Sequence, residues 1–140
     1  MIYQAYGPES ELVSAIVSPT VIVAEDSGDT RHMLRRALEI KGYHVLEARN
    51  GNEAVNLARE YRPHLIIVDL NMPELDGLET IKKVRLLKGS FEHIPIVAMT
   101  AFNVYGMEQA AIDAGCNEYI SKPFDLDELD RRLHGLGFIL

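Results

Sequence analysis

The sequence predicts a single α/β domain in which helices cover both faces of a parallel β-sheet, the doubly wound arrangement. Short runs of apolar, mostly β-branched residues alternate five times along the chain with longer segments of helical period. Three of these runs, at 21–24, 65–68 and 94–99, are apolar at consecutive positions, as expected for strands that are buried on both faces. The length of 140 residues is typical of one domain.

The predicted elements follow one another in a regular order. The five predicted strands lie at 21–24, 43–48, 65–68, 94–99 and 118–120. The predicted helices between and after them lie at 30–41, 52–60, 78–87, 104–114 and 125–133. In the first helix, Met33, Leu34 and Leu38 contribute to one apolar stripe. Gly42 and Gly115 follow the first and fourth helices, where a glycine is favoured.

The two ends of the chain lie outside this repeating pattern. Residues 1–18 contain no lysine or arginine and include one short apolar stretch at 12–17. Residues 1–18 are therefore an N-terminal extension. Their apolar stretch is expected either to form a turn or two of helix on the domain or to be a tail, and both interpretations stay open. The predicted domain spans residues 19–137, and residues 138–140 are expected to form a C-terminal tail.

The composition limits the classes of function. Aspartate and glutamate (21) outnumber lysine and arginine (14), and the net charge of −7 argues against nucleic acid as a partner, since binding phosphates requires a basic surface. No apolar run reaches the roughly 18 residues needed to span a bilayer, so no membrane partner is expected. The first basic residue is Arg31, so a signal peptide with a positive start is not expected. Together with the single Cys116, these features predict a cytoplasmic protein.

Polar residues follow four of the predicted strands at their carboxyl ends. Glu25 and Asp26 follow the first strand and Asp69 the third, whereas Thr100 follows the fourth and Lys122 the fifth. In an open parallel sheet these ends share one edge, where ligands bind. Taken singly, each residue has a simpler role as a turn residue, a helix cap or a solvated side chain. Taken together, three carboxylates at one edge would repel one another unless a cation shared them.

A divalent metal ion and phosphoryl chemistry account for this combination. Mg²⁺ binds oxygen ligands and suits one or two carboxylates together with a phosphate oxygen. A carboxylate can also attack phosphorus to form an aspartyl-phosphate. Lys122 and the metal would then neutralise the phosphoryl oxygens in the transition state. A haloacid-dehalogenase-type phosphatase would need a second aspartate two positions after Asp69, where this sequence has Asn71.

Five segments in a fixed order carry a resemblance to a known family. They are VIVAEDSGDTRHMLRRAL, GYHVLEARNGNEA, PHLIIVDLNMPELDGLE, IPIVAMTA and GCNEYISKPF. With these segments, residues 20–136 resemble the receiver domain of two-component response regulators, in the CheY-like superfamily. The resemblance implies a flavodoxin-like (βα)5 fold with five parallel strands in the order 2-1-3-4-5, counted along the chain.

The resemblance also implies a phosphoacceptor and a metal site. Asp69 would accept the phosphoryl group. Mg²⁺, for which Mn²⁺ can substitute, would be held by oxygen atoms of Glu25, Asp26, Asp69 and Asn71. Within this set Asp26 would be a direct ligand and Glu25 would act through water. Asn71 would contribute its backbone carbonyl.

The same resemblance implies how the phosphoryl group is bound and sensed. The group would be bound by residues that follow the fourth and fifth strands: Thr100, Ala101 and Lys122. Phosphorylation would draw the Thr100 hydroxyl toward the phosphoryl group, and Tyr119 would rotate inward to fill the vacated space. Phe102 is expected to slow dephosphorylation by limiting the access of water, and the polar Asn71 is expected to offset this in part.

The expected function is that of a regulatory phosphoacceptor and not of an enzyme. Asp69 would receive its phosphoryl group from a sensor histidine kinase or a histidine phosphotransfer protein. The movements of Thr100 and Tyr119, the expected switch residues, would change the surface formed by 104–114, 118–120 and 125–133. This surface would control a downstream protein partner or form a homodimer. Residues 138–140 would lie beside it. Two alternatives stay open: a receiver piece of a larger hybrid kinase or multidomain regulator, and a binding module that acts without phosphorylation.

Overall fold

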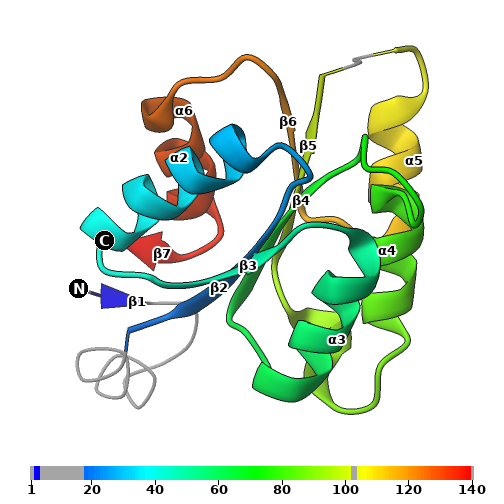
Figure 1. The fold of residues 1–140 in the computed structure, drawn as a ribbon, viewed down its shortest axis with the longest axis horizontal. Helices are drawn as coiled ribbons and strands as arrows, with labels where there is room; N and C mark the ends of the chain where they lie inside the picture. Colours follow the sequence, from blue (N-terminus) through cyan, green and yellow to red (C-terminus); the bar gives the residue numbers. More distant parts are fainter. Residues whose placement is uncertain (1, 4–17, 102–103, 140) are drawn as a thin grey trace.

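The computed structural model describes residues 2–3, 18–101 and 104–139, and its centre is a five-stranded parallel sheet between two layers of helices (Figure 1). The strands of this sheet are β2 (Thr20–Ala24), β3 (His44–Ala48), β4 (Leu65–Asp69), β5 (Ile96–Thr100) and β6 (Glu118–Ser121). Their spatial order is β3-β2-β4-β5-β6, which is 2-1-3-4-5 when the strands of this sheet are counted along the chain. The predicted fold class and strand order are therefore confirmed.

The helices divide between the two faces of the sheet. In the described residues they are α2 (Gly28–Ile40), α3 (Gly51–Tyr61), α4 (Gly77–Arg85), α5 (Met107–Ala114) and α6 (Leu126–Gly135), with a short 3-10 helix, η1 (Ser90–His93), that was not predicted. Figure 1 shows α2 and α6 on one face and α3, α4 and α5 on the other. Four of the helices begin after a side chain that accepts a hydrogen bond from a backbone N–H of the first turn: Ser27, Asn50, Asp76 and Asp125.

The fourth predicted helix begins later than expected. The prediction began it at residue 104, whereas α5 begins at Met107. Gly106, which the prediction placed inside the helix, stands immediately before it with a φ of 86°. Because this left-handed conformation cannot continue an α-helix and is readily adopted only by glycine, Gly106 forms the entry to α5.

Alternation along the strands divides the hydrophobic core into two layers. In β2, Val21 and Val23 pack in the layer that contains residues of α2 and α6. Ile22 and Ala24 pack in the layer that contains residues of α3, α4 and α5. All four side chains are fully buried, because helices on both faces exclude water from both sides of the sheet.

The two ends of the described chain pair with each other. Strand β1 (Ile2–Tyr3) runs antiparallel to β7 (Phe138–Ile139), outside the main sheet (Figure 1). Phe138 is 1% exposed, and its ring centroid lies 6.1 Å from that of Tyr43. The sequence predicts a tail at 138–140, but Phe138 belongs to the core layer of α2 and α6, where burying its ring is favourable. The apolar stretch at 12–17 lies outside the described residues.

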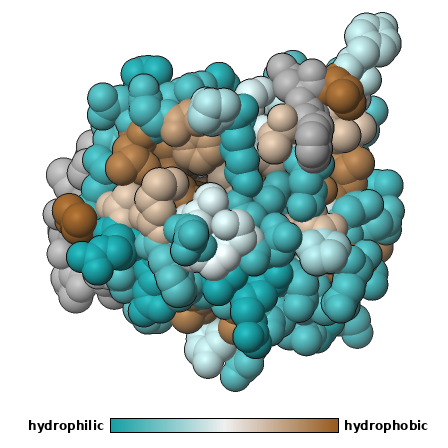
Figure 2. All heavy atoms as spheres, turned by 45° about the horizontal axis from the view of Figure 1, so that its top comes forward, coloured by the Kyte–Doolittle hydropathy of each residue, from teal (hydrophilic) through white to brown (hydrophobic). Residues whose placement is uncertain are grey.

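The surface combines hydrophilic side chains with separate hydrophobic patches. Figure 2 shows that hydrophilic residues cover most of the face in view. Large apolar side chains are exposed at α5 and just before it: Val104, Tyr105 and Ile112. Within the part of the chain that the structure describes, none of the helices has the length and apolar character that crossing a bilayer requires.

Gly77 allows α4 to approach the end of β4 closely. A Cβ atom at Gly77 would lie 2.5 Å from the Cα of Leu70 and 2.6 Å from the carbonyl oxygen of Asp69. Both neighbours are backbone atoms, which cannot move aside as a flexible side chain can. The lack of a side chain at Gly77 therefore helps to set the position of Asp69.

We expect Gly77→Ala to lower the free energy of unfolding by about 2 kcal/mol, because the added methyl group displaces the backbone that carries Asp69. Gly135→Ala is the matched control, since a Cβ there has no neighbour within 4 Å. Gly135 ends α6, so alanine should raise the free energy of unfolding by about 0.5 kcal/mol through its better helix propensity. Urea denaturation of both variants tests this, and equal effects would contradict it.

Candidate functional site

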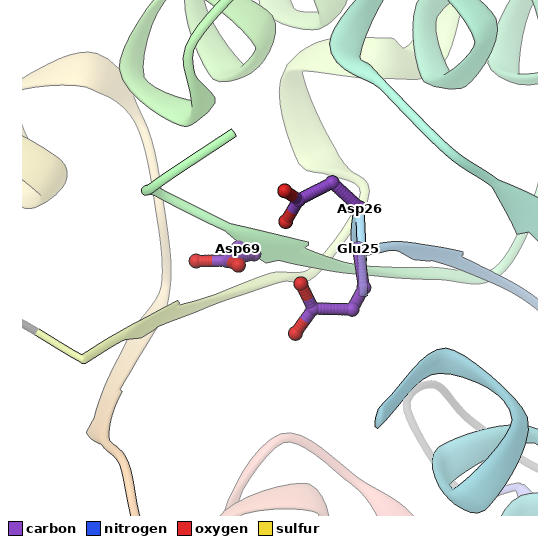
Figure 3. Close-up of side chains that lie close together, drawn as sticks. All are labelled: Glu25, Asp26 and Asp69. Atoms are coloured by element: carbon purple, nitrogen blue, oxygen red, sulfur yellow. The ribbon is translucent and has the colours of Figure 1, made fainter. Parts of the chain in front are cut away.

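The structure brings the predicted polar residues to one edge of the sheet. Glu25 and Asp26 directly follow β2, and Asp69 ends the neighbouring strand β4. Thr100 ends β5, and Lys122 directly follows β6. Carboxylate oxygens of Glu25, Asp26 and Asp69 all lie within 4.8 Å of one another, and Figure 3 shows the three side chains converging from the two strand ends.

The three carboxylates differ in exposure, and one lysine contacts two of them. Glu25 is 1% exposed and Asp69 is 3% exposed, whereas Asp26 is exposed. The Nζ atom of Lys122 lies 2.5 Å from Oε1 of Glu25 and 3.2 Å from Oδ2 of Asp69. Burial opposes the charged form of Lys122, but its bonds to Glu25 and Asp69 outweigh burial and raise its pKa. The ammonium group is therefore charged at neutral pH and reduces the repulsion between the two buried carboxylates.

The single ammonium group does not balance the carboxylates. Burial and a side-chain hydrogen bond with Asp69 raise the pKa of Glu25 to about 7, against the opposing effect of Lys122. A raised pKa means that Glu25 binds a proton more readily than an ordinary glutamate, because it is buried and lies beside another carboxylate. Three carboxylates form the all-oxygen ligand set that Mg²⁺ prefers, so the residues present fit such an ion.

The side chain of Asn71 connects the end of β4 to the end of β5. The backbone N–H of Asn71 donates a hydrogen bond to Oδ1 of Asp69 at 2.9 Å. Its side-chain oxygen, Oδ1, accepts hydrogen bonds from the Thr100 hydroxyl at 2.9 Å and from the Ala101 N–H at 3.1 Å. The resemblance predicts a role for the backbone carbonyl of Asn71 in metal binding and for Asn71 in dephosphorylation, but these two contacts were not predicted. No local signal indicates them, because the partners are 29 and 30 positions away.

Tyr119 lies inward, in contact with Thr100. Its side chain is 8% exposed, belongs to the core layer of α3, α4 and α5, and hydrogen-bonds with the side chain of Thr100. Burial raises the pKa of the Tyr119 hydroxyl. The resemblance predicts this inward position as the result of phosphorylation, and the structure has Tyr119 and Thr100 in contact. Phe102 lies outside the described residues.

A buried arginine that sequence reasoning missed supports the acidic turn after β2. Arg31 of α2 donates hydrogen bonds to the carbonyl oxygen of Glu25 and to Oε1 of Glu47 in β3, each at 2.9 Å. It therefore joins the backbone of the acidic turn to the neighbouring strand. Its spacing from Leu34 and Leu38, which share the buried face of α2, is the signal that could have identified it.

Comparison with known proteins is consistent with this geometry. Residues 21–134 match the response regulator receiver domain family. The chain belongs to this family. A similar relative of this receiver domain is the polar-differentiation response regulator DivK of Brucella anthropi, which is 40% identical over 107 residues, 76% of this chain and 86% of that protein.

Two solved structures resemble this receiver domain in fold and sequence. The receiver domain of sensor histidine kinase PA1611 from Pseudomonas aeruginosa PAO1, with a magnesium ion coordinated in the active site cleft, has a TM-score of 0.78 and 29% identity, covering 86% of this chain and 98% of that chain. The complex of the Saccharomyces cerevisiae histidine phosphotransfer protein Ypd1 with the receiver domain of Ssk1 contains a chain with a TM-score of 0.75 and 31% identity, covering 86% of this chain and 91% of that chain.

The receiver domain should lose stability in acid partly through Glu47. Burial acts to raise the pKa of Glu47, but hydrogen bonds from Arg35 and Arg31 outweigh it, so the net pKa is lowered. A lowered pKa in the folded state stabilises the protein above the unfolded-state pKa, and this contribution is lost as the pH falls through the folded-state pKa. Glu47→Gln should therefore cost about 1 kcal/mol at pH 7 and progressively less in acid.

Urea denaturation of Glu47→Gln and wild type between pH 7 and pH 3 measures this difference. Glu60→Gln, at an exposed position of α3, is the matched control and should change stability by less than about 0.5 kcal/mol at any pH. If Glu47→Gln lowered the free energy of unfolding by the same amount at every pH, the proposed contribution of the Glu47 charge to stability would be contradicted.

Divalent metal binding should depend on Asp26 more than on Glu25. Asp26 is the exposed member of the carboxylate cluster and Lys122 contacts the other two, so Asp26 has oxygens available to an ion from solvent. We expect Asp26→Asn to weaken Mn²⁺ binding by more than about tenfold, and Glu25→Gln to weaken it less. Mn²⁺ titration followed by electron paramagnetic resonance measures both. Asp29→Asn, on the exposed side of the first turn of α2, should leave the affinity unchanged.

Proposed function

We propose that this receiver domain is a phosphorylation-controlled regulator that takes a phosphoryl group onto Asp69 from the phosphohistidine of a sensor histidine kinase or histidine phosphotransfer protein. The observation that carries the proposal is the meeting of the buried Asp69 with Glu25, Asp26 and Lys122 at one edge of the sheet. Membership of the receiver family supports it. The similarity to a receiver in complex with the phosphotransfer protein Ypd1 supports the class of donor.

The transfer proceeds by attack of a carboxylate oxygen of Asp69 on phosphorus. The new bond joins that oxygen to phosphorus, the bond from phosphorus to the histidine nitrogen breaks, and the imidazole leaves with the electron pair. Lys122, 3.2 Å from Asp69, is placed to bind a phosphoryl oxygen. The Thr100 hydroxyl and the Ala101 N–H, at the end of the adjacent strand, are placed to donate to another.

A divalent ion would be held by the carboxylates of Glu25, Asp26 and Asp69 and by the carbonyl of Asn71. Mg²⁺ suits this oxygen set, and Mn²⁺ can substitute because it favours the same ligands. When bound, the ion supplies positive charge that stabilises the phosphoryl oxygens in the transition state. The receiver of PA1611, which was solved with magnesium in its active site cleft, supports this assignment. With these groups the domain would assist its own phosphorylation and dephosphorylation.

The output surface would be formed by α5, β6 and α6. Tyr119 lies in β6 and hydrogen-bonds with Thr100 at the site, so a shift of Thr100 would reach this surface. The exposed apolar side chains of Tyr105 and Ile112 would allow this surface to bind a downstream protein or a second copy of the chain. We place this regulation in the cytoplasm, carried out by the chain alone or as part of a larger regulator.

Asp69→Asn should abolish phosphorylation, because the amide cannot act as the nucleophile. Incubation of the wild-type chain with acetyl phosphate and Mg²⁺ should add the mass of one phosphoryl group, measured by intact-protein mass spectrometry. Excess EDTA should prevent the gain. Asp113→Asn is the matched control at an exposed position of α5, and it should gain the same mass as wild type. A full mass gain in Asp69→Asn would show that the phosphoacceptor is another residue, and no gain in wild type would favour a binding module.

A further inference from the structure

The side-chain oxygen of Asn71 occupies two hydrogen-bond donors at the site. The Thr100 hydroxyl donates to it at 2.9 Å and the Ala101 N–H donates to it at 3.1 Å. The backbone of Asn71 is itself held by the hydrogen bond from its N–H to Asp69, 2.9 Å long. The backbone of Asn71 is therefore fixed beside the Asp69 carboxylate, and its side chain reaches the end of β5.

These two donors are the ones that the proposed function assigns to a phosphoryl oxygen. A hydroxyl has one proton to donate and a backbone N–H has one, so each can fully serve only one acceptor at a time. Resting on that proposed function, we propose that the Asn71 amide oxygen is an internal competitor of the phosphoryl group. It holds Thr100 and Ala101 until a phosphoryl oxygen displaces it.

The hydrogen bonds extend from Asn71 to the switch residue. Besides donating its proton to Asn71, Thr100 hydrogen-bonds with the side chain of Tyr119. These hydrogen bonds connect Tyr119, through Thr100, to Asn71. Asn71 thus holds Thr100 toward the site, and Thr100 in turn contacts the inward Tyr119.

Removing the competitor has two consequences that a purely structural role would not produce. In free Asn71→Ala the Thr100 hydroxyl and the Ala101 N–H donate to water instead of to Asn71. In the complex with a phosphoryl group, both donors keep their hydrogen bonds to the phosphoryl oxygen. A phosphoryl mimic should therefore bind more tightly, by about tenfold for the loss of two competing hydrogen bonds. Tyr119 should also lose its inward preference in the free protein. The backbone N–H and carbonyl of residue 71 are unchanged by the substitution.

The experiment measures binding of beryllofluoride in the presence of Mg²⁺, by calorimetry, to wild type, Asn71→Ala and the control Asn56→Ala. Asn56 is exposed on α3, so its truncation should leave the affinity at the wild-type value. In a Thr100→Val background Asn71→Ala should tighten binding less, because only the Ala101 N–H is then shared. Fluorine NMR of 3-fluorotyrosine-labelled protein, with Tyr119 assigned by Tyr119→Phe, should show the Tyr119 signal shifted in free Asn71→Ala and returned by beryllofluoride.

The outcomes separate this inference from the proposed function. Wild type that binds beryllofluoride, with Asn71→Ala binding equally or more weakly, overturns the competition and leaves the proposed function standing. Wild type that does not bind beryllofluoride contradicts the proposed function, and the Tyr119 signal of the free proteins then still decides whether Asn71 holds the switch. A Tyr119 signal identical in free wild type and free Asn71→Ala overturns the connection between the two residues.

Discussion

Repulsion among Glu25, Asp26 and Asp69 is the constraint around which the active edge of the sheet is organised. Strands β2 and β4 are neighbours and run in the same direction, so their carboxyl ends place the three carboxylates within 4.8 Å of one another. Buried like charges are tolerated only with compensation. Lys122 supplies one positive charge, and a divalent ion suits what remains. The remaining excess of negative charge makes this edge of the sheet suitable for binding a divalent metal ion.

Residues away from the chemistry hold these carboxylates in place. Gly77 lets α4 pack against the backbone that carries Asp69, where a side chain would overlap it. Arg31 bonds to the carbonyl of Glu25 and joins the acidic turn to Glu47 of β3. Such support matters because a charged cluster relaxes apart unless its backbone is fixed. The stability of the domain and the geometry of its site therefore rest on some of the same contacts.

Asn71 connects the carboxylate site to the end of β5. Its amide oxygen binds the two donors at the end of β5, and Thr100 in turn contacts the inward Tyr119. The two residues proposed as the switch, Thr100 and Tyr119, are therefore in contact within the protein. The proposed regulation would depend on the difference in affinity between the amide and a phosphoryl group for the same donors, since a ligand shifts an equilibrium only by such a difference.

The α/β class, the order of the elements and the positions of Asp69 and Lys122 at strand ends could be predicted from the sequence, because apolar runs that alternate with helical segments are a local pattern. The left-handed Gly106 moved the start of α5, which apolar spacing does not reveal. The burial of Phe138 and the hydrogen bond between Thr100 and Asn71 became evident only from the three-dimensional arrangement of the chain. Contacts between residues far apart in the chain depend on strand order and on side-chain rotamers, and no local pattern specifies a rotamer.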